Sequence, residues 1–148
     1  MDAIIEEEIV GSRNHSYLQT VLAAELFNLN QFVVYTELSL DINSKEYKPD
    51  IALYPFETKI EDFQEDILRM IDIPLGVIEI LSPRQFMESI LDKFKLYFTA
   101  GVQSCWLVIP NLRLISIYSN IKTYQMFYEG EIVDEILNIR LPLNRIFR

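Results

Sequence analysis

A glutamate inside an apolar segment is the feature of the sequence that most directly suggests chemistry. Glu79 lies within residues 77–81 (VIEIL), a run that otherwise has the composition of a buried strand. An ionised carboxylate buried there without a partner costs several kcal/mol. A cation, a metal ion or a proton held by a raised pKa would compensate this cost. The run is equally compatible with an edge strand whose glutamate faces water, or with a structural ion pair.

Asp50 is the natural second carboxylate, because it follows Pro49 at the start of the strand predicted at 49–54 and directly precedes its apolar residues 51–54. On its own, an aspartate at the start of a strand more often completes a turn. Two carboxylates from adjacent strands, however, form a site for a hard divalent cation such as Mg²⁺. Such a cation activates water and stabilises the negative charge that develops on a phosphate.

A lysine near the reacting phosphate would complement this chemistry. The helix predicted at 83–100 offers Lys93 and Lys95, which lie on opposite flanks of its apolar stripe, so that periodicity does not choose between them. Lys93 shares its flank with Ser89 and Tyr97, at spacings of four residues. Both lysines are also compatible with solvated side chains whose stems cover apolar surface.

Two further residues project from the helix predicted at 14–30. Glu25 lies near the centre of its apolar stripe, where it needs a partner. It is a candidate third acidic group beside a metal, although an ion pair or a hydrogen bond to the backbone explains it equally well. His15 is the only histidine, and a lone histidine is more often a structural or capping residue than a ligand. Zinc would need a His/Cys cluster, which the sequence lacks.

Composition limits the classes of protein that this chain represents. Its 148 residues, half of them hydrophobic, suit one domain spanning 1–148. One cysteine excludes an internal disulfide framework and suits a reducing, cytoplasmic compartment. No apolar stretch is long enough for a membrane-spanning helix. The net charge of −9 argues against a surface that coats nucleic acid broadly, but leaves room for a local groove.

The order of the predicted elements indicates a mixed α/β (α+β) fold. A strand–helix–strand step between residues 75 and 110 implies a parallel crossover, and hence a central mixed β-sheet flanked by helices. Gly101 is expected to end the second helix. The first two strands are expected to form an antiparallel pair, with a polar turn between them at 41–46. A short helix is expected at 62–71, and the apolar tail at 136–147 is expected to pack against the rest of the domain. The predicted strands are 32–40, 49–54, 75–81 and 105–110, followed by a C-terminal β-meander at 113–119, 123–129 and 131–134.

Four segments, in this order, carry a resemblance to a known family. They are residues 48–54 (KPDIALY), residues 77–83 (VIEILSP), the pattern from Lys93 through Tyr97 to residues 101–102 (GV), and residues 105–110 (CWLVIP). Together they resemble the Uma-two family of bacterial endonucleases, a branch of the PD-(D/E)xK nuclease superfamily, which includes restriction enzymes. The resemblance covers nearly the whole chain, most clearly residues 14–110.

The resemblance implies a restriction-endonuclease-like central sheet flanked by helices. It also implies a metal-binding site in which Asp50 and Glu79 are ligands and the backbone carbonyl of Ile80 adds a third. Mg²⁺, or Mn²⁺ in its place, is the expected cofactor.

The resemblance also selects among the lysines. In the superfamily a lysine follows the glutamate by two residues, and here that position holds Leu81. In this family the lysine looks to have moved onto the following helix, which points to Lys93, with Tyr97 beside it. The family often has an acidic residue four positions before this lysine, where this chain has Ser89. The superfamily often adds a glutamate from its first helix, and Glu25 fits that place.

We therefore predict a Mg²⁺-dependent hydrolase, an endonuclease that cleaves DNA phosphodiester bonds. The alternative is a catalytically inactive nuclease-fold protein that serves as an interaction or regulatory module, motivated by the net charge of −9 and by Leu81. A third reading is hydrolysis of a small phosphorylated metabolite. The apolar, tyrosine-rich C-terminal meander also suggests a homodimer.

Overall fold

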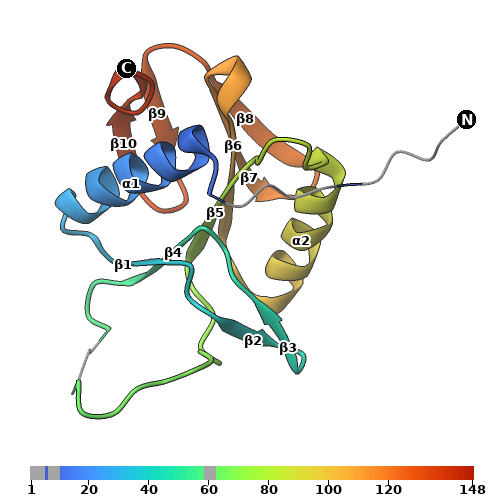
Figure 1. Cartoon of the computed structure of the whole chain (residues 1–148). Helices are drawn as coiled ribbons and strands as arrows, with labels where there is room; N and C mark the ends of the chain where they lie inside the picture. Colours follow the sequence, from blue (N-terminus) through green and yellow to red (C-terminus); the bar gives the residue numbers. More distant parts are fainter. Residues whose placement is uncertain (1–5, 7–10, 59–62) are drawn as a thin grey trace, which may run out of the picture.

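A six-stranded mixed β-sheet forms the centre of the fold, with helices on both of its faces (Figure 1). The computed structural model describes residues 6, 11–58 and 63–148. None of the helices in these residues is long and apolar enough to cross a membrane. The helices and strands are α1 (Arg13–Asn28), β1 (Phe32–Thr36), β2 (Leu40–Ile42), β3 (Lys45–Tyr47), β4 (Ile51–Pro55), β5 (Gly76–Ile80), α2 (Met87–Ala100), β6 (Ser104–Ile109), β7 (Leu114–Asn120), β8 (Thr123–Phe127), β9 (Glu131–Asp134) and β10 (Ile139–Pro142), with short 3₁₀ helices at Pro110–Leu112 and Leu143–Arg145.

The strand order of the sheet is β1-β4-β5-β6-β7-β8. β4 pairs antiparallel with both β1 and β5, whereas β5 and β6 are parallel. The expected antiparallel pair and the expected parallel crossover through α2 are both confirmed. The fold class is thus mixed α/β, as predicted.

Strand alternation divides the core between the two faces of the sheet. On one face, Ile51 and Ile78 pack against three leucines of α1 and against the C-terminal hairpin of β9 and β10. Ala52 and Val77, one position along, face α2 and the hairpin of β2 and β3. β5 is buried along its whole length, which explains its nearly continuous apolar sequence.

The composition of residues 32–40 predicts a single strand, but the structure divides this segment. β1 ends at Thr36, because Glu37 adopts a positive φ of 52° that an extended strand excludes. The polar stretch 41–46 is likewise more than a turn. It holds most of the β2–β3 hairpin, which reverses at Asn43 and Ser44, both with positive φ (54° and 65°). Two positive φ values are what a tight hairpin turn requires.

The second helix begins later than expected. α2 starts at Met87 rather than near Pro83, because Arg84 has a φ of 62° and the side chain of Gln85 accepts a hydrogen bond from the backbone N–H of Ser82 (3.0 Å). The expected short helix at 62–71 is wrong over residues 63–71, which form only turns, bends and one bridge, while residue 62 lies outside the described residues.

The C-terminal region departs from a simple meander. β7 and β8 pair as predicted, but β9 leaves the main sheet and pairs with β10 instead. The apolar tail docks as expected, with Ile139, Leu141 and Ile146 buried against α1 and the sheet. The third strand of the meander therefore covers a face of the sheet rather than extending its edge.

Gly101 ends α2 with a left-handed φ of 115°. A side chain there would meet no atom within 4 Å, so any cost of a substitution lies in the backbone. We predict that Gly101→Ala lowers the free energy of unfolding by about 1–2 kcal/mol. The midpoint of urea unfolding measures this, with Thr99→Ala on the exposed face of α2 as the control. Equal midpoints for Gly101→Ala and the wild type would contradict the prediction.

Candidate active site

Two carboxylates from adjacent strands meet beside the end of β5. Asp50 directly precedes β4, and its backbone N–H donates to Oε1 of Glu79 on β5 (3.0 Å). In return, the N–H of Ile80 donates to Oδ2 of Asp50 (2.7 Å). The carboxylate of Glu79 is thus held by the backbone N–H of Asp50, and the carboxylate of Asp50 is held by the N–H of the residue that follows Glu79. The structure brings together the two acids that the sequence analysis singled out.

The burial of Glu79 is compensated by a cation. Its side chain is only 6% exposed, and its Oε2 lies 3.6 Å from Nζ of Lys93 on α2. Among the alternatives that the sequence left open, the edge strand is therefore excluded, because β5 lies between β4 and β6. Lys95 points elsewhere and pairs with the exposed Asp92 on its own helix (3.6 Å). Of the two lysines, only Lys93 reaches the carboxylates.

His15 is a site residue that the sequence analysis treated as structural. It lies in the first turn of α1, which Ser12 caps, and its Nε2 is 3.1 Å from Oδ2 of Asp50. The hydrogen bond to Asp50 raises the pKa of His15, burial opposes this, and the charges of Asp50, Glu37 and Glu79 raise it further. The only signal in the sequence was a polar residue at the edge of the apolar stripe, which does not specify a partner.

Tyr97 packs beside Lys93 and is almost fully buried. Its ring makes an edge-on contact with Tyr47 on β3 (centroids 6.2 Å apart). Burial raises the pKa of the Tyr97 hydroxyl well above its usual value, and the negative charge of Glu79 adds to this. The hydroxyl therefore keeps its proton at physiological pH and is available as a neutral hydrogen-bond donor.

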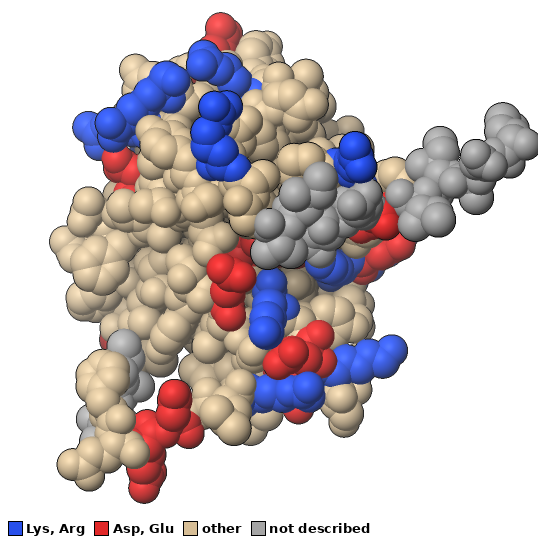
Figure 2. All heavy atoms as spheres, viewed as in Figure 1, with Lys and Arg blue, Asp and Glu red and all other residues tan. Residues whose placement is uncertain are grey.

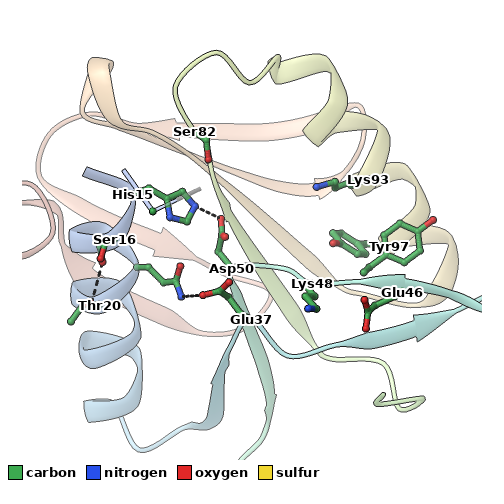
Figure 3. Close-up of a pocket in the computed structure, with 13 residues that line it drawn as sticks. His15, Ser16, Thr20, Glu37, Glu46, Lys48, Asp50, Ser82, Lys93 and Tyr97 are labelled. Carbon is green, nitrogen blue, oxygen red and sulfur yellow. Dashed lines mark hydrogen bonds and ion pairs between the residues drawn. The ribbon is translucent and has the colours of Figure 1, made fainter. Parts of the chain in front are cut away.

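These side chains surround a cavity of about 610 Å³ that opens between α1 and α2 (Figure 3). His15 points into it from α1, Asp50 from the start of β4, and Lys93 and Tyr97 from α2. Glu79 lies behind this surface, against Asp50 and Lys93. The remaining lining is polar for the most part and consists of Gly11, Ser16, Gln19, Thr20, Glu37, Glu46, Tyr47, Lys48 and Ser82.

The expectation that Glu25 assists at this site is not supported. Glu25 does not line the cavity, and its Oε2 lies 3.9 Å from a guanidinium nitrogen of Arg145. Glu25 follows His15 by ten residues, which is about 15 Å along an α-helix. α1 approaches the carboxylates with its N-terminal turn, so a residue near its other end does not reach them.

Asp50 and Glu79 are the carboxylates of this site that a hard divalent cation could use. Among the described residues, no group of three or more His, Cys, Asp or Glu side chains is arranged to hold a metal ion. Mg²⁺ needs no such group, since one or two carboxylates and several waters suffice. Asp50, 18% exposed, faces the cavity, and its Oδ1 has no hydrogen-bond partner among the described residues.

The carbonyl of Ile80 lies on the correct side of β5 to contribute. The N–H of Ile80 points to Asp50, whereas the N–H of the next residue, Leu81, donates to Val108 on the opposite side. In a strand, the N–H and the C=O of one residue point to the same neighbour. The Ile80 carbonyl therefore points towards the side on which Asp50 lies.

Comparisons with known proteins agree with this architecture. A family model described as "Putative restriction endonuclease", that of the Uma2 (Uma-two) family, matches residues 2–143. The crystal structure of a "putative nuclease" from Anabaena variabilis superposes with a TM-score of 0.77 at 19% sequence identity, over 95% of this chain and 84% of that one. This similarity shows a common, restriction-endonuclease-like fold. A comparison with curated proteins gives no match. Because the family model spans nearly the whole chain, this protein belongs to the Uma2 family of restriction-endonuclease-like proteins.

Proposed function

We propose that this protein is a Mg²⁺-dependent endonuclease that hydrolyses DNA phosphodiester bonds in the cavity between α1 and α2. The observation that carries the proposal is the pair of hydrogen bonds that holds Asp50 and Glu79 together. The family description and the name of the Anabaena protein support a nuclease, and DNA is the substrate class that a restriction endonuclease cleaves.

Asp50, Glu79 and the carbonyl of Ile80 are the groups that would hold the cation. When bound there, Mg²⁺ would lower the pKa of a water molecule and offset negative charge on the phosphate. Lys48, Lys93 and His15 also lie at the cavity, and Glu46 pairs with Arg69 (3.6 Å). The attraction for a cation would therefore come from the two neighbouring carboxylates of Asp50 and Glu79 rather than from a general excess of acidic residues.

The protein's own side chains prepare this site before any ligand enters. His15 and the N–H of Ile80 both contact Oδ2 of Asp50, so the carboxylate has one orientation. Lys93 is held by Glu79 yet remains 36% exposed, which places its ammonium group at the cavity surface. There it is positioned to orient the attacking water or to stabilise charge on a phosphate oxygen.

The two lysines of α2 provide a matched test of this assignment. We expect Lys93→Ala to lower kcat/KM for Mg²⁺-dependent nicking of supercoiled plasmid by about 100-fold or more, the cost of losing one preorganised electrostatic contact. Lys95→Ala removes the same charge two residues away and is expected to leave the rate unchanged, because Lys95 pairs with the exposed Asp92 and does not line the cavity.

Equal nicking by the two variants would refute the role of Lys93. The absence of Mg²⁺- or Mn²⁺-dependent nicking in the wild type would refute the proposed function, and would favour the inactive, regulatory alternative.

A further inference from the structure

A second hollow adjoins the cavity at the end of β5. It has a volume of about 610 Å³ and shares His15 and Ser82 with the cavity. From there it passes the first turn of α1 and reaches Pro110, where a smaller hollow of about 170 Å³ continues it towards the end of the chain. The two hollows share Asn14 and Pro110, and we call them together the arginine groove.

The charge of this groove is opposite to that of the protein as a whole. Four arginines line it, and none of its described lining residues is an aspartate or a glutamate, although the chain carries a net charge of −9. Figure 2 shows basic side chains gathered over the N-terminal end of α1 and the nearby C-terminal elements. The lining arginines are Arg13, Arg84, Arg113 and Arg148.

The arginines outside the groove are paired with acidic side chains. Arg69, Arg140 and Arg145 each pair with a carboxylate. Within the groove, neither Arg13 nor Arg113 forms an ion pair with any residue that the structure describes. Among the described residues, these two guanidinium groups make hydrogen bonds but no ion pair: Nε of Arg13 donates to Oδ1 of Asn14 (3.2 Å), and a terminal nitrogen of Arg113 donates to the main-chain oxygen of Arg148 (3.4 Å). The N–H groups that these two bonds do not use are available for contacts with an anion such as phosphate.

The N-terminal end of α1, which lines the groove, also carries a partial positive charge. α1 begins at Arg13 and has no acidic residue in its first turn. The first turn of α1 therefore has no acidic side chain of its own to offset the positive end of the helix dipole. Ser12, Asn14 and Asn111 add neutral polar groups along the lining, which suit contacts with phosphate and sugar oxygens.

We propose that the arginine groove binds the phosphate backbone of the DNA on one side of the bond that is cleaved. This inference rests on the proposed function, because it takes the cavity as the point of cleavage. It assigns cation binding and DNA binding to two adjoining parts of the surface. The paired carboxylates of Asp50 and Glu79 would attract the cation, and the adjoining basic groove would attract the polyanion, so that one strand passes from the groove over Asp50 and Lys93.

The test measures binding separately from cleavage. The probe is a fluorescein-labelled DNA duplex, titrated by fluorescence anisotropy in EDTA so that no divalent cation is present. We expect Arg13→Gln and Arg113→Gln each to weaken binding several-fold for any DNA sequence. Each should also reduce the slope of log K against log salt concentration by about one. Arg140→Gln is the matched control, since Arg140 pairs with Glu131 outside the groove.

Cleavage kinetics give a second readout on the same variants. A groove that only holds the backbone predicts a raised KM with an unchanged kcat for Arg13→Gln and Arg113→Gln. Wild-type affinity in both variants, or an equal loss in Arg140→Gln, would overturn the inference even if the enzyme cleaves DNA. Loss of binding in the groove variants, in a wild type that binds but does not cleave, would uphold the groove and refute the hydrolytic function.

Discussion

Glu79→Gln is expected to abolish Mg²⁺-dependent DNA cleavage while the protein remains folded. The substitution removes one of the two carboxylates that would hold the cation. A metal ion supplies several kcal/mol of transition-state stabilisation. Since each 1.4 kcal/mol, roughly, is a factor of ten in rate, the expected loss is about 1,000-fold or more. Nicking of supercoiled plasmid measures it.

The fold should survive because glutamine replaces glutamate without a change of size. Its amide oxygen still accepts the N–H of Asp50, and the partly exposed Lys93 stays hydrated after losing its partner. Glu25→Gln is the control, because Glu25 carries the same charge but lies beside Arg145, away from the cavity. Cleavage by Glu79→Gln at the wild-type rate, or an equal loss in Glu25→Gln, would contradict the assignment.

Asp134→Ala is expected to cause the largest loss of stability among single substitutions at polar residues outside the site. Asp134 on β9 is 1% exposed and accepts three hydrogen bonds. Oδ2 accepts from the Ser104 hydroxyl (2.6 Å) and the Trp106 indole N–H (2.8 Å), and Oδ1 accepts from the backbone N–H of Leu137 (3.0 Å). Alanine leaves three donors without their partner, and each unsatisfied buried group costs about 1–3 kcal/mol.

The expected total, about 3–5 kcal/mol, is a large part of the stability of an ordinary domain. For a chain of this length it corresponds to a fall in Tm of about 10 °C or more, measured by circular dichroism. Glu131→Ala on the same strand is the control, because its ion pair with Arg140 is exposed and contributes little. An unchanged Tm in Asp134→Ala would show that β9 is not anchored to β6 through this carboxylate.

The sequence predicted the centre of the fold well because its signals there are local. The apolar run around Glu79 and the amphipathic pattern before Gly101 each define an element without reference to the rest of the chain. The C-terminal strands illustrate the limit. Residues 131–134 have the pattern of a strand, but the pattern does not say whether the partner is β8 or β10. That choice depends on which face of the sheet remains uncovered, a property of the folded chain.

In the candidate site, too, the sequence predicts what depends on local pattern and does not predict what depends on packing. Burial of a charge identified Glu79, since any buried carboxylate needs a partner. Periodicity placed Lys93 and Lys95 on the two flanks of α2, and only the packing of that helix against β5 and β6 brings Lys93 to Glu79. For one reason, the sequence did not show that His15 lies beside Asp50 or that Glu25 lies away from the cavity. An apolar stripe shows which side of α1 faces the sheet, but not which end of the helix lies over the carboxylates.

The most direct test of the account is a crystal structure of the protein grown with Mn²⁺, examined for anomalous scattering. We predict one anomalous peak between Asp50 and Glu79, within roughly 2.2 Å of a carboxylate oxygen of each, a distance typical of oxygen ligands to small divalent cations. A site without such a peak, in which His15 still contacts Asp50 and Lys93 still contacts Glu79, would contradict the claim that these two acids form a metal centre.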